Sequence, residues 1–218
     1  MKVYKLTRAN GTTKNNYKWS LPTNDMPGEW HKAEGEGTEL CSNGYLHWYH
    51  HPLLAALLYP RHINFGRYMV LWEGEARGDI KNDKGMKGGS KELRLVRKTD
   101  IPAFSSKQKV AFAIYIAQEV YSDKAFAKWA CAWLDDRDRS KAAAEAAAEA
   151  AARAAGAAGA AAWADAWAAE AAGSAWADAW AAEAAAWAAE AAAWAAEAAT
   201  DPLELLIRCA EKAYNFKP

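Results

Sequence analysis

The chain has 218 residues, enough for one large domain or two small ones, and its 27 Lys and Arg balance its 27 Asp and Glu. The charge is unevenly divided, because residues 1–100 carry 16 basic and 11 acidic residues whereas residues 101–218 carry 11 and 16. A surplus of five positive charges permits an anionic ligand but falls short of the basic footprint of a nucleic-acid-binding protein. We therefore do not expect nucleic acid as a partner.

The cysteines and the N-terminal segment indicate a reducing compartment. Cys41, Cys131 and Cys209 are far apart and lack CxxC spacing, which argues against a disulfide framework and against a zinc site. The start, MKVYKLTRANG, has no apolar signal segment. We expect a cytoplasmic protein with no bound metal and no cofactor.

Residues 1–103 predict a β-rich head domain with one short helix. Short β-prone runs alternate with turn signals in the first 45 residues, and stronger strands are predicted over 67–73 and 91–97. The glycine-rich stretch 84–89 between them predicts a mobile loop. A buried helix is predicted over 52–58, with Pro60 ending it.

Residues 104–218 predict an all-helical domain. Ser105 or Ser106 is a candidate N-cap for a helix running to about residue 121, and Ser122 or Asp123 for the next helix. Near the C-terminus, Asp201-Pro202-Leu203-Glu204 has the pattern of a capping box with proline at the first helical position.

Within that domain, residues 141–200 form an Ala/Trp repeat in which 39 of 60 residues are Ala. Ala is the strongest helix former, and Gly173-Ser174 suits a break, so we expect a helical hairpin, with a single long helix as the alternative. Interspersed acidic residues make a transmembrane helix unfavourable, and we expect no membrane association. Six Trp residues form the expected apolar seam, which closes within the chain or against a second copy in a homo-oligomer: Trp163, Trp167, Trp176, Trp180, Trp187 and Trp194.

The densest polar cluster follows Gly44 and combines His with aromatic residues. Such groups bind nucleotides by stacking and by hydrogen bonds to phosphate or base. His50 and His51 could begin a metal site, but the sequence has no HExxH pattern and no carboxylates at a suitable spacing around them. A purely structural role for the cluster is the other alternative. The candidate ligand-binding residues are Tyr45, His47, Trp48, His50, His51, Arg61 and His62.

The stretch 39–47, followed by His51-Pro52-Leu53-Leu54-Ala55 and Tyr59-Pro60, resembles an uncharacterised domain that is widespread in phages and prophages. That family has an "LCxxGxH…PLxAL…Y" core, then a strand ending in Glu-Gly and a "K…LxLV" strand. The resemblance covers roughly residues 1–100, and such proteins often continue into Ala-rich helical tails with periodic aromatic residues. The tail is also similar to Ala-rich helices in immunity proteins of bacterial toxin systems. The resemblance implies an origin without an activity.

An enzyme, or a degenerate relative of one that only binds a ligand, is the alternative, because the head loosely resembles ADP-ribosyltransferases. In that case the resemblance implies that Glu92 stabilises the developing oxocarbenium charge and that His47 or Tyr45 holds the nicotinamide ribose. The chain departs from the family on its first strand, where Tyr4-Lys5 stands in place of the usual Arg or His. No catalytic residue is therefore assigned.

Together these features predict an α+β fold: a small β-rich N-terminal domain followed by an all-α Ala/Trp-rich helical hairpin or bundle. The function expected is that of a non-enzymatic phage-type accessory protein. It would oligomerise and bind a host protein or a small nucleotide-like ligand, for example in counter-defence as an inhibitor or by sequestering a nucleotide signal. A purely structural assembly protein is the third alternative.

Overall fold

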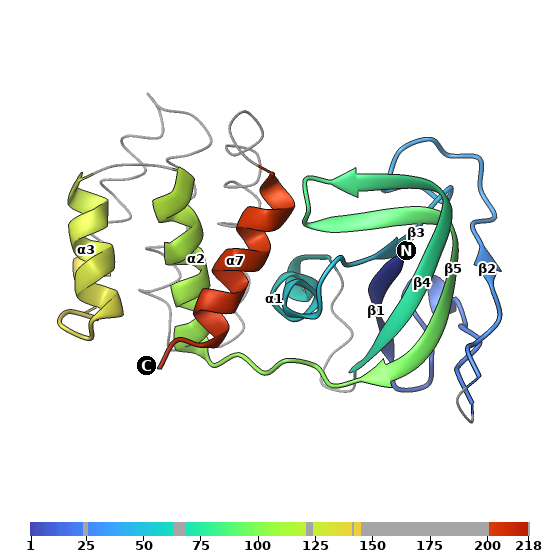
Figure 1. Cartoon of the computed structure of the whole chain (residues 1–218), viewed down its shortest axis with the longest axis horizontal. Coiled ribbons are helices and arrows are strands. Elements are labelled where there is room, and N and C mark those ends of the chain that lie inside the picture. The colour runs from blue at the N-terminus through green and yellow to red at the C-terminus, as the bar shows by residue number, and fades with distance from the viewer. Residues whose placement is uncertain (24–25, 63–68, 121–123, 141, 145–200, 218) are drawn as a thin grey trace. The chain divides into compact units, whose positions relative to one another are not determined.

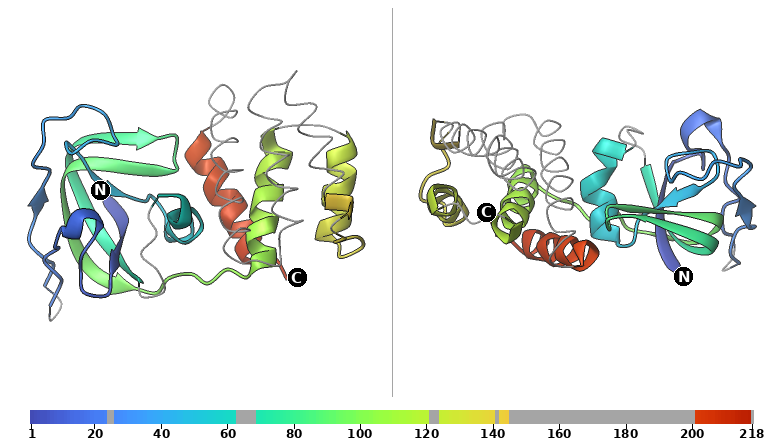
Figure 2. Two further views of the ribbon diagram at one scale, coloured as in Figure 1. Left: turned by 180° about the vertical axis from the view of Figure 1, so that it is seen from behind. Right: turned by 90° about the horizontal axis from the view of Figure 1, so that it is seen from above.

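A computed structural model of the chain describes residues 1–23, 26–62, 69–120, 124–140, 142–144 and 201–217. Two compact units divide at residue 102: unit 1 is Met1–Pro102 and unit 2 is Ala103–Pro218. Figures 1 and 2 show strands in unit 1 and helices α2, α3 and α7 in unit 2. Each unit is described by itself.

Unit 1 is organised by an antiparallel sheet of five strands in which β4 and β5 are by far the longest. The order is β1-β4-β5-β2, and β3 pairs with another part of β5. The remaining elements of unit 1 are the 3-10 turn η1 and helix α1. Their bounds are β1 Lys2–Arg8, η1 Lys14–Asn16, β2 His31–Lys32, β3 Leu46–Trp48, α1 Pro52–His62, β4 Met69–Asp83 and β5 Lys87–Thr99.

A tight turn joins β4 to β5. Lys84 and Gly85 both have positive φ, 46° and 81°, and the Met86 amide donates to the Asp83 carbonyl over 2.8 Å. Positive φ at both central residues suits the right-handed twist of a hairpin. The prediction of a mobile loop over 84–89 is therefore wrong for residues 87–89. These residues belong to the strand β5, and Gly88 and Gly89 pair with both β4 and β3.

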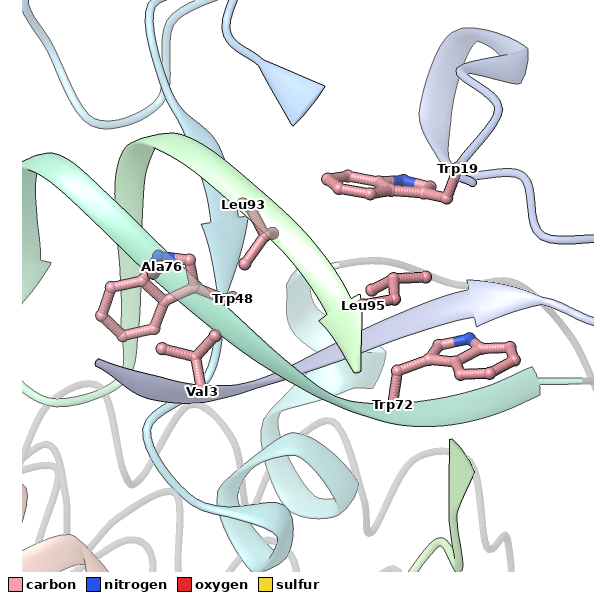
Figure 3. Packing of buried hydrophobic residues seen from close by; sticks show 7 residues of the cluster. All are labelled: Val3, Trp19, Trp48, Trp72, Ala76, Leu93 and Leu95. Carbon is pink, nitrogen blue, oxygen red and sulfur yellow. The ribbon is translucent and has the colours of Figure 1, made fainter. Parts of the chain in front are cut away.

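Hydrogen bonds close the strands of unit 1 into a ring. β1 pairs with β4, β4 with β5 and β5 with β3, and Tyr49, directly after β3, bonds back to Tyr4 of β1. The Tyr4 amide donates to the Tyr49 carbonyl over 2.8 Å, and the reverse bond is 2.7 Å. The ring encloses the core cluster of Figure 3: Val3, Trp19, Trp48, Trp72, Ala76, Leu93 and Leu95.

The predicted fold class is wrong. In place of a small head with short strands, the chain has a large five-stranded antiparallel sheet accompanied by a few helices. The sheet is larger than predicted because β4 and β5 are 15 and 13 residues long. Both strands include segments whose glycines and charged residues are typical of loops. The helical hairpin or bundle expected over 141–200 lies outside the described residues, apart from residues 142–144.

Helix α1 runs from Pro52 to His62, whereas the sequence predicted its end at Pro60. A proline in the last turn removes only one backbone hydrogen bond, so the helix continues past it. Residues 53–58 are all buried, and α1 contacts β1. The helix thereby covers the ring of strands on its β1 side.

Unit 2 contains α2 Ser106–Val120, α3 Lys124–Leu134 and α7 Pro202–Tyr214. Helices α2 and α7 lie side by side, as both figures show, and bury Phe112, Ile114 and Leu206 completely. Helix α7 begins at the predicted cap, since the Asp201 carboxylate accepts from the Leu203 amide over 2.9 Å. Glu119 joins the two helices through ion pairs with Arg208 and Lys212.

Candidate functional site

A cavity of about 620 Å³ opens in unit 1 beside β1 and β3. That volume lies within the range of small-molecule binding sites. Its walls come from β1, from η1 and the residues after it, from the segment 32–34 and from the stretch that leads into β3. The lining residues are Lys5, Leu6, Thr13, Lys14, Asn15, Tyr17, Trp19, Lys32, Ala33, Glu34, Cys41, Ser42, Asn43, Tyr45, Leu46, His47, Trp48, Tyr49 and Lys87.

Lys5 supplies a buried positive charge to this cavity. Alternation along β1 places Lys5 on the face that carries Val3 and Thr7, and only 6% of Lys5 is exposed. Its ammonium group donates to the His47 carbonyl oxygen over 2.5 Å and lies 5.1 Å from the centre of the Trp19 ring. No carboxylate of the described residues pairs with it. Burial accordingly lowers the pKa of Lys5 to about 8.

Three further lysines line the cavity, Lys14, Lys32 and Lys87, against a single carboxylate, Glu34. Lys32 and Lys87 form ion pairs with carboxylates that are not in the lining, at 3.6 and 3.7 Å. Lys87 also donates to the Cys41 sulfur over 3.2 Å. The lining holds four lysines and one glutamate, and once the carboxylates that pair with Lys32 and Lys87 are counted a surplus of one positive charge remains, which favours an anion.

His47 is neutral at physiological pH. Its pKa is lowered to about 4, first by burial and then by the charge of Lys5, with smaller effects of Lys87 and Lys14. Its Nε2 lies 2.5 Å from the Leu40 carbonyl oxygen, which only accepts, so Nε2 carries the proton. The other ring nitrogen, Nδ1, is therefore an acceptor.

An aromatic cluster forms another part of the wall. Tyr17 meets Trp19 edge-on at 5.3 Å between ring centres, and the His31 ring lies 4.7 Å from the Trp19 ring. The Ser20 amide donates to His31 Nε2, so neutral His31 donates from Nδ1 to the Tyr17 hydroxyl over 3.0 Å. The Tyr17 proton remains available for a ligand, and the half-buried Tyr17 ring offers it surface, whereas Trp19 is only 3% exposed and supports the wall from the core.

Of the sequence-predicted site residues, Tyr45, His47 and Trp48 line the cavity. The Tyr45 hydroxyl donates to Asp79, which raises the pKa of Tyr45 to about 12. The Trp48 ring nitrogen donates to Ser90 Oγ over 3.1 Å, and this side chain is 1% exposed. Tyr45 and Trp48 therefore support the wall from the core, whereas His47 brings a polar group to it.

The remaining predicted residues are not in the cavity lining. The His50 ring lies edge-on against the Trp48 ring at 4.7 Å, and His51 Nδ1 accepts from the Leu53 amide at the start of α1. His51 thus acts as a helix cap. Arg61 and His62 belong to the last turn of α1, and their side chains lie outside the described residues.

Glu92, the acidic residue of the transferase alternative, is held on the strand β5 by cations. It forms ion pairs with Arg77 at 2.5 Å and Lys32 at 3.6 Å, and the hydrogen bond from Arg77 lowers its pKa. The described lining of the cavity does not include it. Glu92 is therefore not brought together with His47 and Tyr45 in one pocket.

The sequence analysis missed the residues that give the cavity its charge and most of its rings, namely Lys5, Lys14, Tyr17, Trp19, Lys32 and Lys87. A usable signal existed only for Lys5, whose place in the strand Val3-Tyr4-Lys5-Leu6 puts it on the same face as Val3. The others come from η1, from the residues after it, and from strand ends at Lys32 and Lys87, and no periodicity predicts that these segments meet.

Several expectations concern residues or features away from the cavity. The six Trp of the expected seam, 163 to 194, lie outside the described residues. Within the described part of the chain, no helix is long and apolar enough to cross a membrane. The same part contains no group of three or more His, Cys, Asp or Glu arranged to hold a metal ion.

Comparison with known proteins gives no relative from which to assign the site. No family model, no curated protein and no solved structure matches the chain. The spacing in this chain also departs from the phage-domain pattern by one residue in each half, since it reads Leu-Cys-x-x-Gly-x-x-His and Pro-Leu-x-x-Ala-Leu. Function is therefore argued from the cavity itself.

The low pKa of His47 makes stability depend on acidity. In the unfolded chain His47 takes up a proton near its ordinary pKa of 6.5, whereas in the folded chain it does so only near 4. Stability is thus retained above about pH 6.5 and is lost as the pH falls toward 4, by on the order of 2–3 kcal/mol from this residue. We expect chemical denaturation of His47→Gln to show a smaller loss over this window than the wild type. An equal loss in both would contradict the assigned protonation.

Proposed function

We propose that unit 1 binds a small anionic ligand that carries a planar ring, of the nucleotide type, and that the protein holds this ligand without transforming it. The observation that carries the proposal is the buried ammonium of Lys5 in a cavity with three more lysines. Burying an unpaired charge costs folding free energy, so its retention is best explained by an anion that pairs with it.

The ring-binding part of the proposal is supported by His47 and by the half-buried Tyr17, which packs on the buried Trp19. Stacking on an aromatic surface contributes about 1–3 kcal/mol per base and tolerates any base. His47 Nδ1 can accept a hydrogen bond and the Tyr17 hydroxyl can donate one, so the wall offers both kinds of partner that the edge of a nucleobase requires.

Among broader roles, the one we favour is sequestration of a nucleotide signal, as in counter-defence by a phage-type accessory protein. It fits a binding cavity without an assigned catalytic residue. Assembly into a homo-oligomer, suggested by the Trp-rich sequence, and capture of a host protein are compatible with it. The ADP-ribosyltransferase alternative is less favoured, because Glu92 is engaged by Arg77 and Lys32 away from the cavity lining.

Native mass spectrometry of the full-length protein with ADP-ribose as the probe tests this function. We expect a one-to-one complex per unit 1 that releases unmodified ADP-ribose on denaturation, with no conversion of the probe over hours. The same spectra report the number of copies in the assembly. Absence of a complex at millimolar ADP-ribose would contradict nucleotide binding. Conversion of the probe to adenosine monophosphate and ribose 5-phosphate, or release of nicotinamide when NAD replaces ADP-ribose, would contradict a non-enzymatic role.

A further inference from the structure

We propose that Lys5 is also a nucleophile, which captures phosphorylated aldehydes in the cavity as a Schiff base. The inference rests on the proposed anion-binding function, because it uses the same cavity and the same surrounding lysines. It assigns a covalent step to one named nitrogen, which reversible nucleotide binding does not require.

The first support is the position of the amine. Lys5 is fixed on β1 of the closed ring of strands, 94% of its surface is covered, and its side chain belongs to the cavity wall. Its Nζ has one hydrogen-bond acceptor, the His47 carbonyl oxygen, and no carboxylate of the described residues holds it as a permanent cation. An amine so placed can lose its proton without breaking an ion pair.

The second support is the reactivity of a buried amine. Because burial lowers the pKa of Lys5 to about 8, roughly a quarter of it is neutral at pH 7.5, compared with about one part in a thousand for an ordinary lysine. A lone pair on nitrogen is what attacks a carbonyl carbon, and desolvated lysines are activated as Schiff-base nucleophiles in this way.

The third support is the setting of that amine. Lys14 and Lys87 lie near enough to His47 for their charges to lower its pKa, so cations suited to a phosphate surround the place where an aldehyde would meet Lys5. The Trp19 ring lies beside the amine, and the half-buried Tyr17 ring that packs on Trp19 lines the same cavity and offers surface to a planar aldehyde. Neutral His47, with Nδ1 unprotonated, can accept and return a proton during the dehydration step.

The reaction is balanced without any further reagent. The Lys5 lone pair forms a bond to the aldehyde carbon while the carbonyl π electrons move to oxygen, which takes a proton from the nitrogen. The resulting carbinolamine loses its hydroxyl group and the remaining nitrogen proton as water, and a C=N bond forms. The phosphate takes no part in the chemistry and serves only to hold the aldehyde in place.

Capture of pyridoxal 5′-phosphate by the full-length protein tests the inference. The protein is mixed with one equivalent of this probe at pH 7.5, reduced with borohydride and digested, and each lysine is quantified by peptide mass spectrometry. We expect Lys5 to carry at least about ten times more pyridoxyl phosphate than any other lysine, in keeping with its larger neutral fraction. We expect pyridoxal, which lacks the phosphate, to label Lys5 much less.

Two variants provide controls. Lys5→Met should lose the dominant adduct, whereas Lys107→Met, which alters an exposed lysine of α2, should retain it. Labelling spread evenly over the lysines, or absent from Lys5 in the wild type, would overturn the inference whether or not the variants fold. If ADP-ribose still binds in that case, only the covalent step is contradicted. If ADP-ribose also fails to bind, the proposed nucleotide-binding function is contradicted as well.

Discussion

Replacing Gly88 by alanine should lower the free energy of unfolding by about 3 kcal/mol, through a clash in the core of unit 1. A Cβ added at Gly88 would lie 2.1 Å from Cη2 of Trp48 and 2.3 Å from its Cζ3. The Trp48 ring is 1% exposed and its nitrogen donates to Ser90, so moving the ring away would break that hydrogen bond and the core packing around it. Chemical denaturation of Gly88→Ala measures the loss.

A double-mutant cycle separates this clash from a general effect of alanine in a strand. Trp48→Phe removes the outer part of the indole that meets the new methyl group. We therefore expect Gly88→Ala to cost less in the Trp48→Phe background than in the wild type, by at least about 1 kcal/mol. Additive effects of the two changes would contradict the close approach of Gly88 in β5 to the Trp48 ring of β3.

Lys5→Met should have opposite effects on stability and on binding. Methionine has a similar shape and no charge, so it removes the cost of burying an ammonium group, and we expect the free energy of unfolding at pH 7 to rise by about 1–3 kcal/mol. The loss of one charged partner should weaken binding of adenosine monophosphate about 30-fold, which corresponds to about 2 kcal/mol. Denaturation and calorimetric titration measure the two quantities.

The pH dependence of stability gives this prediction a second readout. The folded pKa of Lys5 is about 8 and its ordinary value is 10.5, so below pH 8 the folded chain bears the full cost of the buried charge. As the pH rises from about 8 to 10.5 the unfolded chain holds more protons, and the wild type gains stability that Lys5→Met does not. A variant that loses stability and affinity alike would instead assign Lys5 a structural role.

Local signals in the sequence predicted individual elements better than their assembly. The Asp201-Pro202 pattern located the start of α7, because a helix cap is decided by the residues next to it. The strand over 91–97 was also predicted, but its extension to Lys87 was not. Glycines at 88 and 89 predict a loop from sequence, whereas in the fold they allow Trp48 and Tyr45 to pack against the backbone.

The candidate site was predicted only where its residues are contiguous. Tyr45, His47 and Trp48 belong to one short stretch, so a search for local clusters found them. The long-range pairing that closes the ring of strands at Tyr4 and Tyr49 brings Lys5 of β1 to the same cavity as the residues of β3, and such pairing leaves no local trace. His50 and His51 belong to the same cluster in sequence, yet one packs on Trp48 and the other caps α1.

Calorimetric titration of the full-length protein with adenosine monophosphate and with adenosine tests the central claim, that the cavity of unit 1 binds an anion with a planar ring. We predict that adenosine monophosphate binds at one site, that its affinity falls as salt is raised, and that adenosine, which lacks the phosphate, binds at least about tenfold more weakly. Equal affinity for the two compounds, or binding of adenosine monophosphate that Lys5→Met leaves unchanged, would contradict the claim.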